Sequence, residues 1–200
     1  METSYKHLYE TITESLVQKG YAVIENALSP STIQRLAQHA TSLQNYKEAG
    51  ISANTQLHID KNRRRDKIHW LEDDNAVEKS FLEFAEGLRL YLNRSLFLGL
   101  HYYEAHFAKY EVGDFYEKHL DAFKNSKNRV VTTVYYLNDT WQQSDGGELV
   151  IYDKNDTVLE KLLPTRNTLV VFLSEEFPHE VLPANKTRHS IAGWFRIDKV

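Results

Sequence analysis

Two short segments carry the residue types that hold a divalent metal. Glu117-Lys-His-Leu-Asp121 places a histidine two residues before an aspartate, and Phe177-Pro-His179 follows an apolar stretch later in the chain. Because side chains two apart on an extended segment point to the same face, His119 and Asp121 can offer one nitrogen and one oxygen to a common ion. With His179 as third ligand, the set suits iron(II) with open coordination positions, and zinc hydrolysis is the less fitting alternative.

A third segment could hold an anion beside that metal. If Thr187-Arg-His-Ser-Ile-Ala-Gly-Trp-Phe195 is a strand, four side chains share one face: Arg188, Ser190, Ala192 and Trp194. Two of them are small and leave room beside a guanidinium fork, where a planar carboxylate could fit. A lone His-X-Asp triplet is weak evidence and an exposed strand-edge arginine is the ordinary alternative, so the weight lies in the combination.

Helical periodicity predicts three helices in the first half of the chain. Leu8, Ile12 and Leu16 predict a first helix that ends at Gly20, before a short strand at residues 21–24. Ser29 can cap a second helix with Pro30 in its first position. Its expected buried stripe comprises Ile33, Leu36, Ala37 and Ala40. A third helix fits residues 77–92, and the polar stretch 53–67 predicts a mobile loop before a strand at 68–71.

Short strands divided by turn signals dominate the second half. We expect them at residues 101–110, 130–137, 148–152, 168–173 and 191–197. Helices followed by this many strands favour an α+β fold, a double-stranded β-helix (jelly roll) with N-terminal helices packed on one sheet. We expect a single domain over residues 1–200, with helical support over about 1–100 and the jelly-roll core over about 101–197.

Composition excludes several classes of function. The 42% hydrophobic content is enough for one core, and the formal net charge of -4 favours no nucleic-acid partner. The absence of cysteine excludes disulfides, thiolate ligands and a cysteine nucleophile. No stretch has membrane-spanning length and the N-terminus does not read as an export signal, so we expect a soluble cytoplasmic protein without a membrane partner.

The four-residue pattern resembles the iron(II)/2-oxoglutarate-dependent dioxygenases, specifically their prolyl 4-hydroxylase branch, which includes the hypoxia-type prolyl hydroxylases and bacterial relatives. The resemblance covers most of the chain from about Gly20 to Phe195. Other motifs that carry it are GYAVIENALS at 20–29, DKIHW at 66–70, VVTTVYYLN at 130–138, GGELVIY at 146–152 and PHEV at 178–181.

The resemblance implies roles for further residues. Tyr136 and Tyr110 would hydrogen-bond the 2-oxoglutarate carboxylate with Arg188, although one of the neighbours Tyr135 and Tyr136 must pack in the core because they face opposite ways. The positions that would line a substrate groove are Arg129, Tyr116, Trp194 and Arg64. Ala192 departs from the hypoxia-type enzymes, which have a threonine there. Seven histidines receive no role: His7, His39, His58, His69, His101, His106 and His189.

The implied activity is hydroxylation by iron(II), 2-oxoglutarate and dioxygen, with succinate and CO2 as coproducts and ascorbate as a possible reductant. Asp121 favours hydroxylation, since halogenating relatives carry a small residue at the carboxylate position.

The implied substrate is a prolyl residue of a protein or peptide, for example a translation or ribosomal component, with residues 53–67 closing over it. Alternatives are hydroxylation of another side chain or of a free amino acid or small metabolite, a noncatalytic metal or oxoglutarate sensor, and a metal-free binding protein. The sequence does not specify the oligomeric state.

Overall fold

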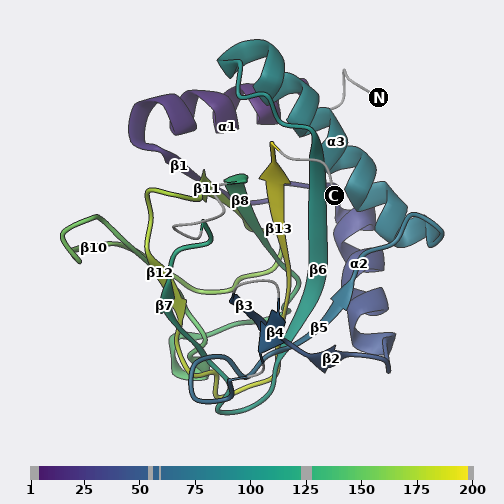
Figure 1. Ribbon diagram of the computed structural model, residues 1–200. Helices are drawn as coiled ribbons and strands as arrows, with labels where there is room; N and C mark the ends of the chain where they lie inside the picture. The colour runs from purple at the N-terminus through teal and green to yellow at the C-terminus, as the bar shows by residue number, and fades with distance from the viewer. Residues whose placement is uncertain (1–4, 54–55, 59, 123–127, 198–200) are drawn as a thin grey trace.

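The computed structural model describes residues 5–53, 56–58, 60–122 and 128–197 (Figure 1). Helix α1 (Lys6–Lys19) ends as expected at Gly20, which has a φ of 79° and donates its N–H to the Leu16 carbonyl at 3.0 Å. This left-handed conformation suits glycine because it has no Cβ. The chain then turns directly into strand β1 (Tyr21–Ile24).

The other two helices begin at side-chain caps. In α2 (Pro30–Ser42), the Ser29 hydroxyl accepts from the Thr32 amide at 3.2 Å, and in α3 (Ala76–Leu96), the Asn75 side chain accepts from the Val77 amide at 2.8 Å. Both caps satisfy amides that have no partner within the helix. The predicted stripe of α2 is buried, and α3 extends four residues beyond the expected end, to Leu96.

Two antiparallel sheets face each other, as expected for a jelly roll. The larger has the order β1, β11 (Leu169–Leu173), β8 (Arg129–Tyr136), β13 (Arg188–Arg196), β6 (Tyr102–Tyr110), β5 (Lys67–Trp70) and β2 (Lys47–Glu48). The smaller has the order β10 (Val158–Leu162), β9 (Leu149–Tyr152), β12 (His179–Val181) and β7 (Tyr116–His119). A short 3-10 turn, η1 (Gln143–Asp145), precedes β9.

The three helices cover one face of the seven-stranded sheet, and its other face meets the smaller sheet (Figure 1). Odd-numbered residues of β6 and β8, such as Phe107 and Tyr135, pack with the helices, whereas even-numbered Ala108, Val134 and Tyr136 pack between the sheets. The period of two along these strands therefore separates a helix-facing core from an inter-sheet interior.

Several boundaries differ from the sequence-based expectation. Strand β13 begins at Arg188, three residues before the expected start, because it pairs with β6 from Arg188 and with β8 from Ser190. Part of the expected loop at 53–67 is instead strand β4 (Gln56–His58), which pairs with β3 (Ile51–Ala53). Residues 54–55 and 59 of that stretch lie outside the described residues.

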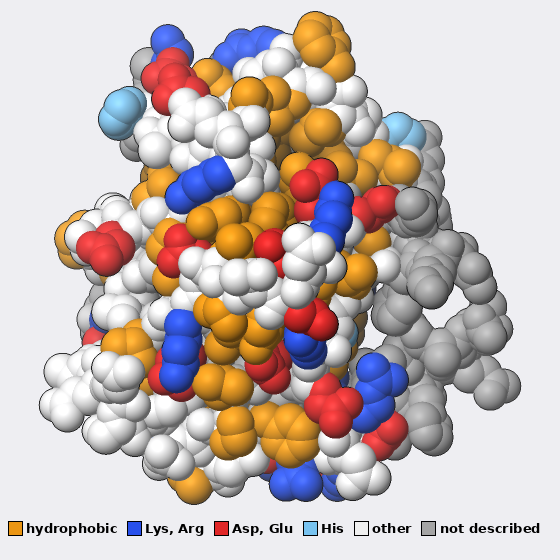
Figure 2. All heavy atoms as spheres, turned by 90° about the vertical axis from the view of Figure 1, so that its left-hand side faces the viewer, with side chains coloured by type: hydrophobic (Ala, Val, Ile, Leu, Met, Phe, Trp, Pro, Cys, Tyr) orange, Lys and Arg blue, Asp and Glu red, His pale blue; other side chains and the backbone are white. Residues whose placement is uncertain are grey.

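None of the described helices is long and apolar enough to cross a membrane. Figure 2 shows the molecule from the left-hand side of Figure 1, and basic and acidic side chains are interspersed there among hydrophobic ones. This face therefore lacks the extended basic surface that phosphate binding would need.

Candidate active site

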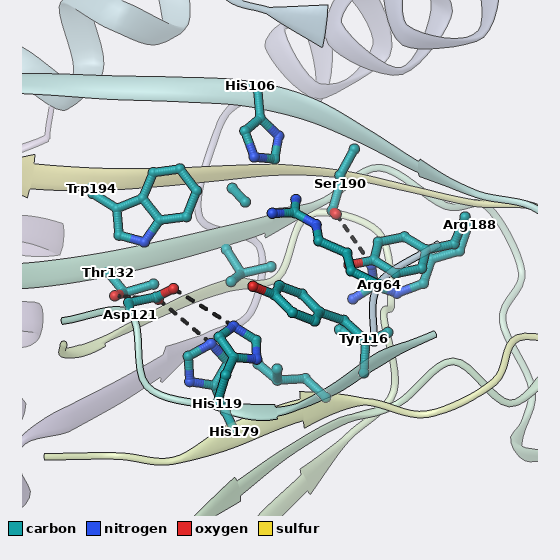
Figure 3. Close-up of a pocket in the computed structure, with 16 residues that line it drawn as sticks. Arg64, His106, Tyr116, His119, Asp121, Thr132, His179, Arg188, Ser190 and Trp194 are labelled. Atoms are coloured by element: carbon teal, nitrogen blue, oxygen red, sulfur yellow. Dashed lines mark hydrogen bonds and ion pairs between the residues drawn. The ribbon is translucent and has the colours of Figure 1, made fainter. Parts of the chain in front are cut away.

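His119, Asp121 and His179 meet between the two sheets, as the sequence predicts (Figure 3). One ligand atom from each lies within 4.8 Å of the others. His119 and His179 are paired across β7 and β12, and their Nε2 atoms lie 3.7 and 3.5 Å from the Asp121 carboxylate. Two imidazoles and one carboxylate on a single side of a cavity could hold one divalent metal with positions left open.

Backbone carbonyls orient both histidine rings. His119 Nδ1 donates to the Glu117 carbonyl at 2.7 Å, and His179 Nδ1 donates to the Phe177 carbonyl at 3.0 Å. Each bond fixes the proton on Nδ1 and leaves the Nε2 lone pair for a metal. Burial, together with the nearby His119, lowers the pKa of His179 to about 4, which keeps this ring neutral at physiological pH.

Asp121 is held by a buried hydroxyl. Thr132 Oγ1 donates to Asp121 Oδ2 at 2.8 Å and lies 2.9 Å from Ser174 Oγ. Burial alone would raise the pKa of the Asp121 carboxyl, but His179 and His119 lower it well below its usual range. The carboxylate is therefore ionised and fixed in orientation, as a metal ligand requires.

Arg188 is buried at another part of the same cavity, and no carboxylate among the described residues pairs with it (Figure 3). Its side chain is 1% exposed, Nη1 donates to Ser190 Oγ at 3.2 Å, and Nε has no partner among the described residues. An unpaired buried cation costs several kcal/mol. Gly147, with a φ of 69°, leaves Arg188 its space, since a Cβ there would lie 3.2 Å from Arg188 Cδ.

Two tyrosines flank this guanidinium. The Arg188 Cζ atom lies 4.8 Å from the ring centroid of Tyr110 and 5.1 Å from that of Tyr136. The Tyr136 hydroxyl is buried without a partner in the described part of the chain, and burial raises the pKa of this group to about 12 although Arg188 opposes the shift. Two neutral hydroxyls and a guanidinium could thus receive a carboxylate. Tyr135 faces the helices, as the alternation predicts.

Tyr116 and Arg64 line the cavity, but each is engaged with protein groups. The Tyr116 ring stacks on His119 at a centroid distance of 3.6 Å, and Arg64 Cζ lies 4.6 Å from the Tyr116 centroid. Arg64 also forms a two-pronged ion pair with buried Asp66, at 2.6 and 2.9 Å. Arg64 therefore orients Tyr116 over a candidate ligand in this structure.

Arg129 and Trp194 lie together beside the cavity. Arg129 Cζ is 3.7 Å from the Trp194 ring, and Arg129 donates to Glu104 at 3.0 Å. Trp194 itself lines the cavity, as do Ser190 and Ala192, so the predicted face of β13 is confirmed. Arg129 is not among the residues of the cavity wall and reaches it through Trp194.

His106, to which the sequence gives no role, also lies at the cavity. His106 is 2% exposed and lines the cavity opposite the candidate ligands (Figure 3). Alternation from Tyr110 along β6 could have found it, since both positions are even-numbered. The same alternation from Tyr136 along β8 leads to Thr132, which sequence analysis also missed. His189 faces away from the cavity, as expected.

Known proteins with a similar sequence and fold identify the family to which this site belongs. Residues 105–196 match the family model described as the 2OG-Fe(II) oxygenase superfamily. A solved prolyl-4-hydroxylase from Pseudomonas putida is 34% identical, with a TM-score of 0.86 over 96% of this chain and 100% of that one. The chain belongs to the 2OG-Fe(II) oxygenase superfamily. The oxygenase fold explains why two histidines, a carboxylate and an arginine converge between facing sheets.

Other relatives of this oxygenase are also prolyl hydroxylases by name. A hypoxia-inducible factor prolyl hydroxylase from Caenorhabditis elegans is 28% identical over 95% of this chain, but the match spans only 28% of that protein's length. A prolyl hydroxylase from Trichoplax adhaerens, solved with a hypoxia inducible factor peptide fragment, is 26% identical with a TM-score of 0.84, over 97% of this chain and 91% of that one.

Proposed function

We propose that this oxygenase hydroxylates a prolyl residue of a protein or peptide, with iron(II) bound by His119, Asp121 and His179. The observation that carries the proposal is one cavity that joins this triad to buried Arg188, whose Nε has no partner among the described residues. The donor set suits iron(II), and the unpartnered Arg188 Nε and Tyr136 hydroxyl suit the distal carboxylate of 2-oxoglutarate. The residues therefore fit both iron(II) and 2-oxoglutarate, the two groups named in the family description.

When bound, iron(II) with 2-oxoglutarate supplies the oxidation of a C–H bond by dioxygen, giving the hydroxylated product, succinate and CO2. One oxygen atom enters the product and the other enters succinate. The chain's own residues have three tasks in this proposal: the carbonyl-bound histidines keep their Nε2 atoms free of protons, Thr132 holds Asp121, and Arg188 with Tyr136 and Tyr110 fixes the cosubstrate.

The cavity wall also limits the access of water. Apolar side chains of both sheets contribute to it, namely Ala108, Val134, Leu149 and Val181. An oxidising site needs such a wall, because water and unproductive side reactions compete with the intended C–H bond. Trp194, with Arg129 stacked on it, would bound the approach of the substrate.

A prolyl substrate is supported by the relatives' names and by the physical properties of proline. Its ring fixes one backbone torsion, so an X-Pro segment loses less conformational entropy on entering a cavity. A translation or ribosomal component of the cytoplasm is the candidate that the resemblance implies, and ascorbate would serve as the reductant in assays.

Mass spectrometry of a treated cell lysate tests the proposal. The lysate is incubated with the protein, iron(II), ascorbate, 2-oxoglutarate and air, and a parallel reaction omits 2-oxoglutarate. We expect a mass gain of one oxygen atom on specific prolines in the complete reaction alone. Hydroxylation confined to free amino acids would contradict the prolyl assignment, and binding of 2-oxoglutarate without succinate formation would indicate a sensor.

A further inference from the structure

His106 presents an unused hydrogen-bonding atom to the cavity. Its Nδ1 lies 3.3 Å from the Phe107 carbonyl, which can only accept, so Nδ1 carries the proton and Nε2 keeps a lone pair. No hydrogen bond of Nε2 occurs among the described residues, and the ring points into the cavity across from the triad (Figure 3).

Neighbouring strands fix the position of this ring. In the sheet register, His106 lies directly between Trp70 of β5 and Ala192 of β13. The Trp70 ring meets it edge-on at a centroid distance of 5.1 Å, and the Trp194 ring lies 5.4 Å away. The methyl group of Ala192 is too short to cover the imidazole, so the ring is held between two indoles with its edge open to the cavity.

The surroundings keep the imidazole neutral. Burial, reinforced by the nearby Arg64 guanidinium, lowers the pKa of His106 to about 3, although Asp66 opposes the shift. A neutral imidazole with its proton on Nδ1 acts at Nε2 as a hydrogen-bond acceptor. Beside it, the buried Trp194 Nε1 is a donor without a partner among the described residues. An acceptor and a donor on adjacent rings match the N–H and C=O groups of a peptide backbone.

We infer that His106 is a specificity-determining residue, whose Nε2 accepts a hydrogen bond from the backbone N–H of a residue adjoining the target proline. The inference rests on the proposed prolyl hydroxylase function. Proline has no amide N–H, so the nearest donor that every prolyl segment offers belongs to a neighbouring residue. An acceptor at this position favours a peptide over a free imino acid and orients the ring against the candidate iron site.

The first test compares His106→Leu, which removes the acceptor, with His106→Gln, whose side-chain oxygen can replace Nε2. The probe is the best substrate from a synthetic library of peptides with a central proline. We expect His106→Leu to raise KM about 3- to 10-fold, the equivalent of one hydrogen bond, and to form more succinate than hydroxyproline. His106→Gln should restore most of both properties.

Anaerobic iron(II) and 2-oxoglutarate binding should be unchanged in both variants, which checks that they fold. His189→Leu, which replaces a histidine of β13 outside this cavity, is the matched control and should behave like the unaltered protein. A merely structural role for His106 predicts lower thermal stability without excess succinate, and that result would overturn the inference.

A second measurement identifies the donor. In two versions of the peptide, an ester replaces the backbone amide whose N–H belongs to the residue either before or after the proline. One ester should raise KM for the unaltered protein and have no further effect on His106→Leu. If the ester and His106→Leu raised KM independently of each other at both positions, the inference would be contradicted. If the unaltered protein hydroxylates no proline in the library or in a lysate, the proposed function fails and the inference fails with it; an active protein with a normal His106→Leu variant refutes the inference alone.

Discussion

The two faces of the seven-stranded sheet differ in how their buried polar groups are satisfied. On the helix-facing side, the Tyr135 hydroxyl donates to Asn167 at 2.7 Å, and the Tyr9 hydroxyl donates to the Phe84 carbonyl at 2.8 Å. On the cavity side, Tyr136 Oη, Arg188 Nε and Trp194 Nε1 have no partner in the described part of the chain.

This difference distinguishes a packed core, whose buried polar groups pair with each other, from a binding site, whose polar groups pair with a ligand. A buried polar atom without a partner costs about 1–3 kcal/mol, so a protein rarely keeps several together without a ligand to satisfy them. Under the proposed function, the adjacent residues Tyr135 and Tyr136 of one strand would serve stability and ligand binding respectively. Substitutions that separate stability from binding test this division.

The largest effect is expected for His179→Ala. Loss of one imidazole should reduce bound iron(II) from about one per chain to a trace. Turnover should fall further than the loss of about 10- to 100-fold that is typical when a residue bonded to a metal ligand is replaced. Elemental analysis measures the metal. His101→Ala, which alters an exposed histidine, should keep full metal content. Unchanged iron in His179→Ala would refute the ligand assignment.

Arg188→Lys should weaken 2-oxoglutarate binding about 10- to 100-fold, because lysine keeps the charge but loses the planar fork that pairs with a carboxylate. The dissociation constant can be measured anaerobically from the metal-to-ligand absorption band. Arg166→Lys, at a surface ion pair with Asp139, is the control and should bind normally. Equal affinity in the two variants would remove Arg188 from the cosubstrate site.

Thr132 and Thr133 allow the same comparison between neighbours. Thr132→Val frees the Asp121 carboxylate and should weaken iron(II) binding about 10-fold. Thr133 lies on the opposite face, 2.7 Å from the Tyr103 hydroxyl, so Thr133→Val should instead lower the free energy of unfolding by about 1 kcal/mol with normal metal binding. Metal titration and urea unfolding of both variants separate the two outcomes, and a reversed pattern contradicts the division.

The smallest and sharpest contrast is between Tyr135→Phe and Tyr136→Phe. The first should lower the free energy of unfolding by about 1 kcal/mol without changing 2-oxoglutarate affinity. The second removes an unsatisfied hydroxyl, so it should leave the stability of the ligand-free protein unchanged or higher while weakening 2-oxoglutarate about 3- to 10-fold. Equal loss of stability in both variants would show that the two faces are not distinct in this respect.

Local signals in the sequence predicted the helices and the main strands well. Gly20, Ser29 and Pro30 act where they stand in the chain, so their effects could be read without the fold. The period of two also predicted the cavity face of β13. Short strands such as β7 and β12 were not predicted as elements, because three or four residues carry little periodicity and depend on pairing partners far along the chain.

The site was predictable where a motif marked it and missed where the fold alone assembles it. His119, Asp121, His179 and Arg188 were found from spacing and resemblance, and the structure brings all four to one cavity. His106 matched no motif, and its position became apparent only when β6 paired with β13 and β5. Arg64 lines the cavity where the resemblance implies a substrate groove, but its ion pair with Asp66 depends on geometry that composition does not reveal.

The position of β13 at the centre of the larger sheet has a consequence for how such a gene can vary. Its register is fixed on both sides, by β6 and by β8, and four alternate residues face the cavity. Inserting or deleting one codon within this strand would turn Arg188 or Trp194 to the opposite face, since side chains alternate. Edge strand β10, paired on one side and largely exposed, carries no such constraint. Length changes should therefore be tolerated at β10 and eliminated at β13, whereas single substitutions can be accepted in both.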